Sequence, residues 1–587
     1  MTERTKTAFK LLKAAAFLGI FGDILLRQTP WGLNAFLFVA AFAAALVVLT
    51  KLRRPELLTI ERLALVVAMV FFGSMFVVRD SIELRVYDTF MIIGLMGVIS
   101  LGALGIRVRI AGAFHYICGF FWSALSSVLA PVVVLGADVE WKSLPGTQAS
   151  RRVFSILRGI AIALPLILIF GALFSSADAR FEAWVNSIIY FDLGTVISHI
   201  LLTAGLAWLC AGYFRGSIIT PGFAAGRSHL MRDDVKSGDR PAGDRDVQSA
   251  SYFDQAAAEP TTAAVTLPDN ATVLEHINRS DPPNKDDVGP AGSITKKRDW
   301  QDLDSSSLPT VFTLGTIETV IVLGLVDLLF LSFVLFQLPY LFGGMELVQN
   351  TPDFKLADYA RRGFGELVAV AALVLPMLLF SHWLLRSGTK RLVTIFRALA
   401  AVQIALVFIV MASAVQRLIL LTGEAGYGLT TVRFYPMVFM IWLSVIFVWF
   451  GATVLRGARD KFAWGALWSA IIVLAATNLM NPDAFIARTN IALMHNGRDF
   501  DAYYNVSALS ADAVPEILSA LSTMPIDPQC QAKFDLHIRY WDLGKEGDLR
   551  SLNYSRKSAF YQLRNNDALL HQRDGCPAWM QLHESGE

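Results

Sequence analysis

The sequence predicts an all-α membrane protein: a polytopic bundle of about 11 to 12 transmembrane helices, with a small helical extracytoplasmic C-terminal domain. Of the 587 residues, 54% are hydrophobic and only 17% are charged, whereas soluble domains contain about 25% charged residues. The mean hydropathy is +0.49, and apolar runs long enough to cross a bilayer recur along the chain. A soluble protein of this size could not bury so much apolar surface.

Twelve runs have the length and composition of membrane helices. The first follows a basic N-terminal tail and imitates a signal peptide, but it lacks a small-x-small cleavage site, so we expect it to be retained. The candidate spans lie near 11–26, 33–50, 62–78, 88–104, 112–136, 155–175, 195–214, 316–341, 366–385, 393–415, 434–455 and 462–480.

Basic loops predict the orientation of the bundle, because short cytoplasmic loops are enriched in Lys and Arg. The strongest signals are at 51–54, 107–109, 386–391 and 456–461. If 112–136 crossed the membrane, the later basic loops would face outward. We therefore predict eleven spans and one non-spanning segment at 112–136, where Pro131 favours a broken helix. The N-terminus is then cytoplasmic and the C-terminus extracytoplasmic; twelve spans is the simpler alternative.

The composition divides the chain into four parts. Residues 1–215 and 311–480 are the two transmembrane halves, and 216–310 are poor in large apolar residues, which predicts a disordered cytoplasmic linker. Residues 481–587 predict a soluble helical domain outside the cytoplasm. Cys530 and Cys576 would then lie in an oxidising compartment, where they could pair, but the sequence gives no distance between them.

A series of motifs resembles a known family. The motifs are "FSSADARF" (174–181), "FVLFQLPYLFGG" (333–344), "YARRGFGEL" (359–367), "YGLTTVRFY" (427–435), "NPDAFIARTNI" (481–491) and "DAYYNVSALSADAVPEIL" (501–518). Together they resemble an uncharacterised bacterial inner-membrane family, catalogued as a domain of unknown function of the 4173 type. The resemblance implies a multi-pass protein of the bacterial inner membrane. It implies no activity.

On the predicted topology, the polar residues of these motifs share the outer face of the bundle. They form a candidate binding site in which Arg361 and Arg433 could hold an anionic group. The alternative is a rim of Tyr and Arg side chains that only anchors the helices at the interface. The candidate residues are Tyr359, Arg361, Glu366, Tyr427, Arg433, Asn481, Asp483 and Arg488.

Asp327 is the strongest candidate inside the membrane, because its run "VLGLVDLLFLSF" places a carboxylate near the middle of a span. It could bind a proton or a cation, or accept a hydrogen bond from another helix. The histidines show no HxxxH or HExxH spacing, and nucleotide and nucleophile-elbow motifs are absent. We therefore expect no metal and no cofactor. The net charge of +2 gives no reason to expect nucleic acid.

Three functions remain. The first is a non-enzymatic envelope protein that binds, senses or assembles something at the outer face, such as another envelope protein or a small anionic ligand. The second is an ion-coupled transporter that uses Asp327. The third is a transferase for a lipid-linked substrate, with Asp80, Asp178 or Asp483 as base or metal ligand. In each case the lipid bilayer is the surrounding partner.

Overall fold

The computed structural model describes residues 3–139, 193–219, 315–342, 364–385, 390–422, 428–545, 548–572 and 575–577. These residues fold into helices, which confirms the predicted all-α class. Most of the predicted linker at 216–310 lies outside the described residues, as does the candidate span at 155–175.

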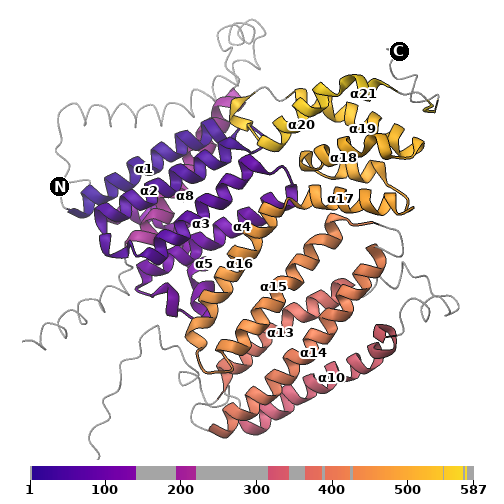
Figure 1. The fold of residues 1–587 in the computed structure, drawn as a ribbon. Helices are drawn as coiled ribbons and strands as arrows, with labels where there is room; N and C mark the ends of the chain where they lie inside the picture. The colour runs from indigo at the N-terminus through magenta and orange to yellow at the C-terminus, as the bar shows by residue number, and fades with distance from the viewer. Residues whose placement is uncertain are drawn as a thin grey trace, which may run out of the picture. The chain divides into compact units, whose positions relative to one another are not determined.

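The N-terminal half packs as a group of helices, drawn in indigo to magenta in Figure 1. Its apolar core includes Leu18, Leu46 and Phe72. Helices α1 and α8 approach closely at Gly19, where an added Cβ would lie 2.5 Å from the Thr203 carbonyl oxygen; small residues permit such contacts between membrane helices. The elements are α1 (Glu3–Leu26), α2 (Leu33–Arg53), α3 (Ile60–Val78), α4 (Ile82–Ser100), α5 (Ala113–Val133) and α8 (Leu193–Ile218).

The C-terminal half has its own apolar core, in which α14 packs along α10 and α13. Helix α16 also reaches the N-terminal half, because Ile471 is buried in that core and α16 contacts α3 and α4. The elements are α10 (Thr316–Phe342), α13 (Phe364–Leu384), α14 (Lys390–Thr422), α15 (Thr431–Thr453) and α16 (Phe462–Met480).

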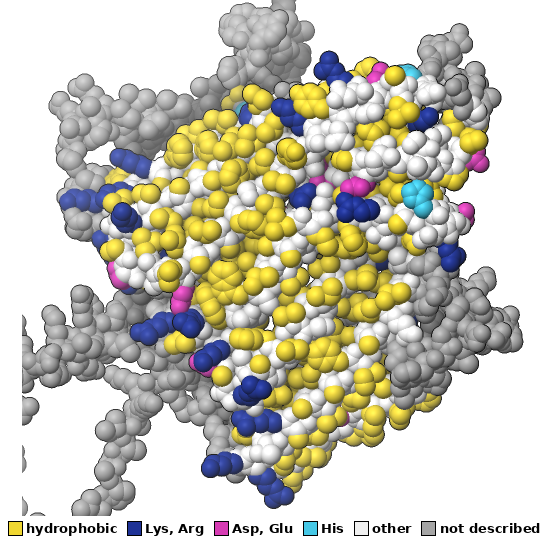
Figure 2. Space-filling view, in the orientation of Figure 1, with side chains coloured by type: hydrophobic (Ala, Val, Ile, Leu, Met, Phe, Trp, Pro, Cys, Tyr) yellow, Lys and Arg dark blue, Asp and Glu magenta, His cyan; other side chains and the backbone are white. Residues whose placement is uncertain are grey.

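The described helices carry the surface of a multi-pass membrane protein. Ten of them are long and apolar enough to cross a membrane. Large apolar side chains point outward; Phe336 is 79% exposed and Val432 is 80% exposed. Figure 2 shows hydrophobic side chains across the middle of the visible face, with Lys and Arg gathered at its left and lower edges. Contact with lipid explains an apolar exterior that water would penalise.

The basic loops meet at one end of the bundle, here called the basic end. The turn Val108–Ile110 contacts the turn Arg459–Lys461, although the two are far apart in the sequence. At the same end, Arg62 at the start of α3 donates to the Ser217 carbonyl at the end of α8, at 3.2 Å. The opposite end, which holds the C-terminal domain, is here called the domain end. The described basic loops therefore share one side, as the Lys/Arg pattern predicted.

Helix α5 departs from one expectation. It runs unbroken through Pro131 and continues into a π turn at Val134–Asp138, so the predicted break is wrong. Near its start, Gly119 packs against Gly97 in the last turn of α4. Beyond its end, Asp138 binds Arg4 and Arg215, each at 2.6 Å. By length and composition, α5 with its π turn is one of the ten described helices that could cross a membrane.

The C-terminal domain contains α17 (Pro482–His495), α18 (Val514–Ala520), α19 (Ile526–Gly544), α20 (Tyr554–Asn565) and α21 (Asp567–His571). Its apolar core continues into the bundle, because Leu84 of α4 and Phe434 of α15 are part of it. Cys530 and Cys576 form a disulfide with Cα atoms 5.7 Å apart. The bridge ties the start of α19 to the chain beyond α21.

Candidate functional site

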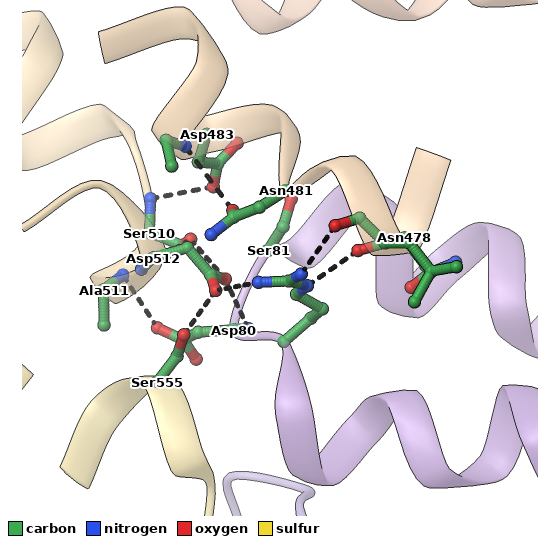
Figure 3. A network of polar contacts seen from close by, with 12 residues as sticks. Asp80, Ser81, Asn478, Asn481, Asp483, Ser510, Ala511, Asp512 and Ser555 are labelled. Atoms are coloured by element: carbon green, nitrogen blue, oxygen red, sulfur yellow. Dashed lines mark hydrogen bonds and ion pairs between the residues drawn. The ribbon is translucent and has the colours of Figure 1, made fainter. Parts of the chain in front are cut away.

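The α3–α4 turn forms a polar junction with the C-terminal domain. Helix α3 ends at Val78 and α4 begins at Ile82, so Arg79, Asp80 and Ser81 are a polar break between two apolar runs. All three make hydrogen bonds that link elements far apart in the sequence, and Figure 3 shows Asp80 among Ala511, Asp512 and Ser555 of the domain. This cluster is here called the junction.

Asp80 binds groups from both sides of the junction. Its carboxylate accepts hydrogen bonds from Arg85 of α4 at 2.6 Å and from Arg556 of α20 at 2.5 Å. It also accepts from the backbone N–H of Ala511 at 3.1 Å. The residue is 6% exposed, so these charge-assisted bonds replace the water that the carboxylate has lost.

Asp512 reverses this arrangement, because a domain carboxylate is bound by the turn. It accepts from the backbone N–H of Asp80 at 2.7 Å, from the Arg79 guanidinium at 3.4 Å and from the hydroxyl of Ser555. Arg79 in turn donates to the carbonyls of Asn478 and Leu479, at 2.7 and 3.1 Å, where α16 ends. The junction therefore joins α3, α4, α16 and the domain.

Asp483 lies beside the junction in the first turn of α17. One carboxylate oxygen accepts from the Ser510 N–H at 3.0 Å, while the other is buried and has no hydrogen-bond partner among the described residues. Burial raises the pKa of Asp483 to about 6. Asn481 precedes it at φ 60° and caps α17 through its side chain. Asp483 is therefore a junction carboxylate that changes its charge near pH 6.

The loop at 548–556 closes the ends of three bundle helices, whose terminal backbone groups have no partner within the helix. Arg550 donates to the Ile24 carbonyl of α1 at 2.7 Å, and the Leu33 N–H of α2 donates to the Leu552 carbonyl at 2.9 Å. Asn553 donates to the carbonyls of Phe76 and Arg79 at 2.9 and 2.8 Å, capping α3.

An open cleft of about 200 Å³ lies next to the junction on the domain. Its wall contains the rings of Phe560 and Tyr561, and the Lys557 ammonium lies 6.0 Å from the centre of the Tyr561 ring. Asn553 and Arg556 line the cleft and also belong to the loop and junction contacts. The cleft therefore combines aromatic rings with cationic side chains and the Asp548 carboxylate, beside the residue that binds Asp80.

Four of the eight predicted site residues have described side chains, and these four make separate contacts. The Arg433 guanidinium donates to the Gly428 carbonyl, and Arg488 pairs with Glu516 at 2.5 Å. Neither arginine lines the cleft. Asn481 and Asp483 lie at the junction (Figure 3). Three other predicted residues lie outside the described part of the chain: Tyr359, Arg361 and Tyr427. The side chain of Glu366, at the start of α13, is also outside the described part.

Sequence reasoning missed most of the junction. It named Asp80 only as a base for a transferase, and it missed Arg79, Asp512, Ser555 and Arg556. The available signal was the polar triplet between two apolar runs at 79–81. Nothing local identifies its partners, since Asp80 and Asp512 are 432 positions apart.

Asp327 lies inside the bundle on α10, and it is 7% exposed. Neither of its carboxylate oxygens has a hydrogen-bond partner among the described residues, and the same holds for both side-chain polar atoms of the fully buried Gln403 on α14. Helices α10 and α14 pack along each other, and buried neighbours of both residues belong to the same apolar core. Unsatisfied polar groups at this depth are costly and often functional.

Other predicted or candidate polar groups lie elsewhere. Asp23 and Arg27, four residues apart on α1, form an ion pair at 3.1 Å, and His199 also contacts Asp23, at 2.5 Å. Among the described residues, one group that could hold a metal ion combines His537, Asp567 and His571 in the domain.

Residues 64–233 and 288–520 match the family described as a domain of unknown function, DUF4153. The sequence motifs had indicated an uncharacterised family of the 4173 type. The match confirms a domain of unknown function but corrects its number to 4153. No curated protein and no solved structure matches the chain. The matched region includes Asp80, Asp483 and Asp512. It ends at residue 520, before the residues that line the cleft and the two cysteines of the disulfide. The chain therefore belongs to the DUF4153 family, and its described helices are those of a multi-pass membrane protein.

Proposed function

We propose that this protein is a non-enzymatic binding and sensing protein of the bacterial inner membrane, with residues 481–587 on its extracytoplasmic face. The observation that carries this proposal is a reciprocal pair of hydrogen bonds across the junction: the Asp80 N–H donates to the Asp512 carboxylate, and the Asp80 carboxylate accepts from the Ala511 N–H. It makes the α3–α4 turn and the domain one hydrogen-bonded unit. A change in the domain would therefore act on two bundle helices.

The chemistry of the junction favours signalling over simple anchoring. Buried ion pairs add little stability relative to a well-packed apolar contact, because both charges must leave water. They do require one particular geometry, since a displaced partner leaves an unpaired buried charge. An interface of this kind supports two distinct arrangements better than gradual sliding.

The cleft supplies the binding site of this proposal. Its occupant would contact Arg556, whose guanidinium also holds Asp80 at 2.5 Å. Lys557 and the aromatic wall favour a small ligand with an anionic group and an apolar part. Binding of a ligand in the cleft would thus affect the α3–α4 turn through the Arg556 side chain.

Thermal unfolding of the purified full-length protein in neutral detergent tests this function. The probes are glycerol 3-phosphate and dihexanoyl phosphatidylglycerol. We expect at least one probe to raise Tm in a concentration-dependent manner, corresponding to about 2.7 kcal/mol at a hundredfold excess over Kd. The Lys557→Ala/Tyr561→Ala variant should lose that shift.

The matched control is Lys545→Ala/Tyr503→Ala, which alters an exposed lysine and an exposed tyrosine outside the cleft lining. It should retain the wild-type shift. No shift with either probe, or equal shifts in both double variants, would contradict binding in the cleft.

Ion-coupled transport is the second candidate, favoured by the unsatisfied carboxylate of Asp327 and the amide of Gln403. A bound cation would satisfy Asp327 and its neighbours within the bundle. We expect sodium, compared with choline at equal ionic strength, or a change in pH to shift the Tm of the wild type, and Asp327→Asn to remove that dependence. The same dependence in both proteins would exclude this role for Asp327.

A further inference from the structure

Two histidines and an aspartate converge at the end of the C-terminal domain. His537 lies on α19, and Asp567 and His571 lie one turn apart on α21. One potential ligand atom from each residue lies within 4.8 Å of the other two. His537 and Asp567 are partly buried and His571 is exposed, so the group is open to solvent on one side.

The surrounding contacts hold both helices in register. Cys530, Lys533 and His537 are spaced by three and four residues on α19 and therefore share one face. Cys530 forms the disulfide with Cys576, and Lys533 donates to the Gln572 carbonyl at 2.7 Å. Gln572 and Cys576 are thus held against the face that carries His537.

We propose that His537, Asp567 and His571 bind one divalent transition-metal ion of the Zn²⁺ class. Imidazole nitrogen with one carboxylate oxygen is a typical Zn²⁺ donor set, whereas Ca²⁺ and Mg²⁺ prefer oxygen ligands only. Zn²⁺ bond lengths of about 2.0–2.2 Å in a tetrahedral site place ligand atoms about 3.3 Å apart. Rotation of the exposed His571 side chain, with small rotations of the two partly buried side chains, can close the remaining distance.

The hydrogen bonds of the imidazoles agree with this assignment for His571. Its Nδ1 lies 2.8 Å from the Asp567 carbonyl oxygen, which leaves Nε2 for a metal; metal-bound histidines commonly donate their second ring N–H in this way. His537 Nε2 accepts from the Trp541 indole at 3.0 Å. Trp541 is 61% exposed and can move away, so a metal at this nitrogen would replace the indole N–H.

The metal would form a second cross-link between α19 and the end of the domain, parallel to the disulfide. A three-residue donor set leaves a fourth position for water or a ligand atom. The family match ends at residue 520, so this group lies in a part of the chain that the match does not cover.

Metal content and affinity of the full-length protein test this site, using a purification tag without histidine. After dialysis against zinc and removal of free metal, we expect one Zn²⁺ per chain, with affinity measured by competition against a chromophoric chelator. His537→Ala and His571→Ala should each weaken binding at least tenfold, and Asp567→Asn should weaken it less. Trp541→Phe should bind at least as tightly as the wild type.

His495→Ala is the matched control, because His495 lies on α17 with its imidazole 3.0 Å from Thr523; it should bind zinc like the wild type. Circular dichroism of each variant establishes that the helices are retained, and cobalt absorption of the wild type reports the coordination number. Equal zinc binding by the wild type and a folded His537→Ala/His571→Ala variant, or no bound zinc in the wild type, would overturn the site.

Discussion

The side chain of Asp512 accepts hydrogen bonds from several separate elements of the structure. Its carboxylate is fully buried, and it accepts bonds from Asp80, Arg79, Ser510 and Ser555. Removal of one partner from a buried charged cluster leaves the other charges unpaired. The stability of the junction should therefore depend on this residue.

Asp512→Ala is expected to lower the free energy of unfolding by about 3–5 kcal/mol. Thermal or denaturant unfolding in detergent, followed by tryptophan fluorescence, measures the change. Asp542→Ala is the matched control, since Asp542 forms an exposed pair with Lys545 and should change stability by less than about 1 kcal/mol. A similar small effect at Asp512 would show that the junction contributes little.

Asp483 should make stability depend on pH. Its pKa is about 6 in the folded protein, against an ordinary value of 3.8. The folded state therefore binds the extra proton between these values, and the free energy of unfolding falls as the pH rises from about 4 to about 6. At 1.36 kcal/mol per unit, the loss is up to about 3 kcal/mol.

Asp483→Asn isolates this effect, because the neutral amide can still accept from the Ser510 N–H. We expect the variant to be at least as stable as the wild type at pH 7.5. As the pH falls to 4.5, the free energy of unfolding of the wild type should rise relative to that of the variant. Unfolding curves at several pH values give the difference. A constant difference across this range would contradict the raised pKa.

At the scale of elements, helix ends depend on groups from distant parts of the chain. The C-terminal carbonyls of α3 are capped by Asn553 of the 548–556 loop, which also begins α20 by accepting from the Arg556 N–H at 3.0 Å. One side chain therefore serves two helices. Its loss should loosen the loop against the bundle.

Asn553→Ala should lower the free energy of unfolding by about 1–3 kcal/mol, through a lost cap and buried carbonyls left unpaired. It should also speed proteolysis between α19 and α20, which mass spectrometry can locate. The control is Asn496→Ala, at an exposed asparagine after α17. Equal stability and equal cleavage in the two variants would argue against the capping role.

At the scale of the whole molecule, the two ends of the bundle differ in charge and in covalent chemistry. Described basic loops meet at one end, while the domain at the other end carries a disulfide. Positive charge is typical of cytoplasmic loops, and disulfides persist in oxidising compartments. Both properties support the proposed orientation.

Cysteine labelling in intact cells measures this orientation. The background is Cys118→Ala/Cys210→Ala, which keeps the disulfide and removes the free thiols. An impermeant maleimide should label Tyr503→Cys and Leu549→Cys, both exposed on the domain, and should label Lys51→Cys and Asp460→Cys at the basic end only after lysis. The reverse pattern would invert the topology, and labelling at both ends would contradict a single outer face.

The sequence by itself determined the class of this protein and the grouping of its described basic loops. These are local properties, because a membrane helix must be apolar over its own length and a loop carries its own charge. The i,i+4 pair of Asp23 and Arg27 was predictable for the same reason. By contrast, Pro131 did not break α5, which continues through Val133 into a π turn.

Only the tertiary structure decided which polar groups meet. The bond between Asp80 and Asp512 spans 432 positions, and the contact between Arg556 and Asp80 spans 476. His537 likewise meets His571 through the packing of α19 on α21. Such contacts leave no periodic signal in the sequence, because the partners become neighbours only when helices pack and their buried charges must find one another.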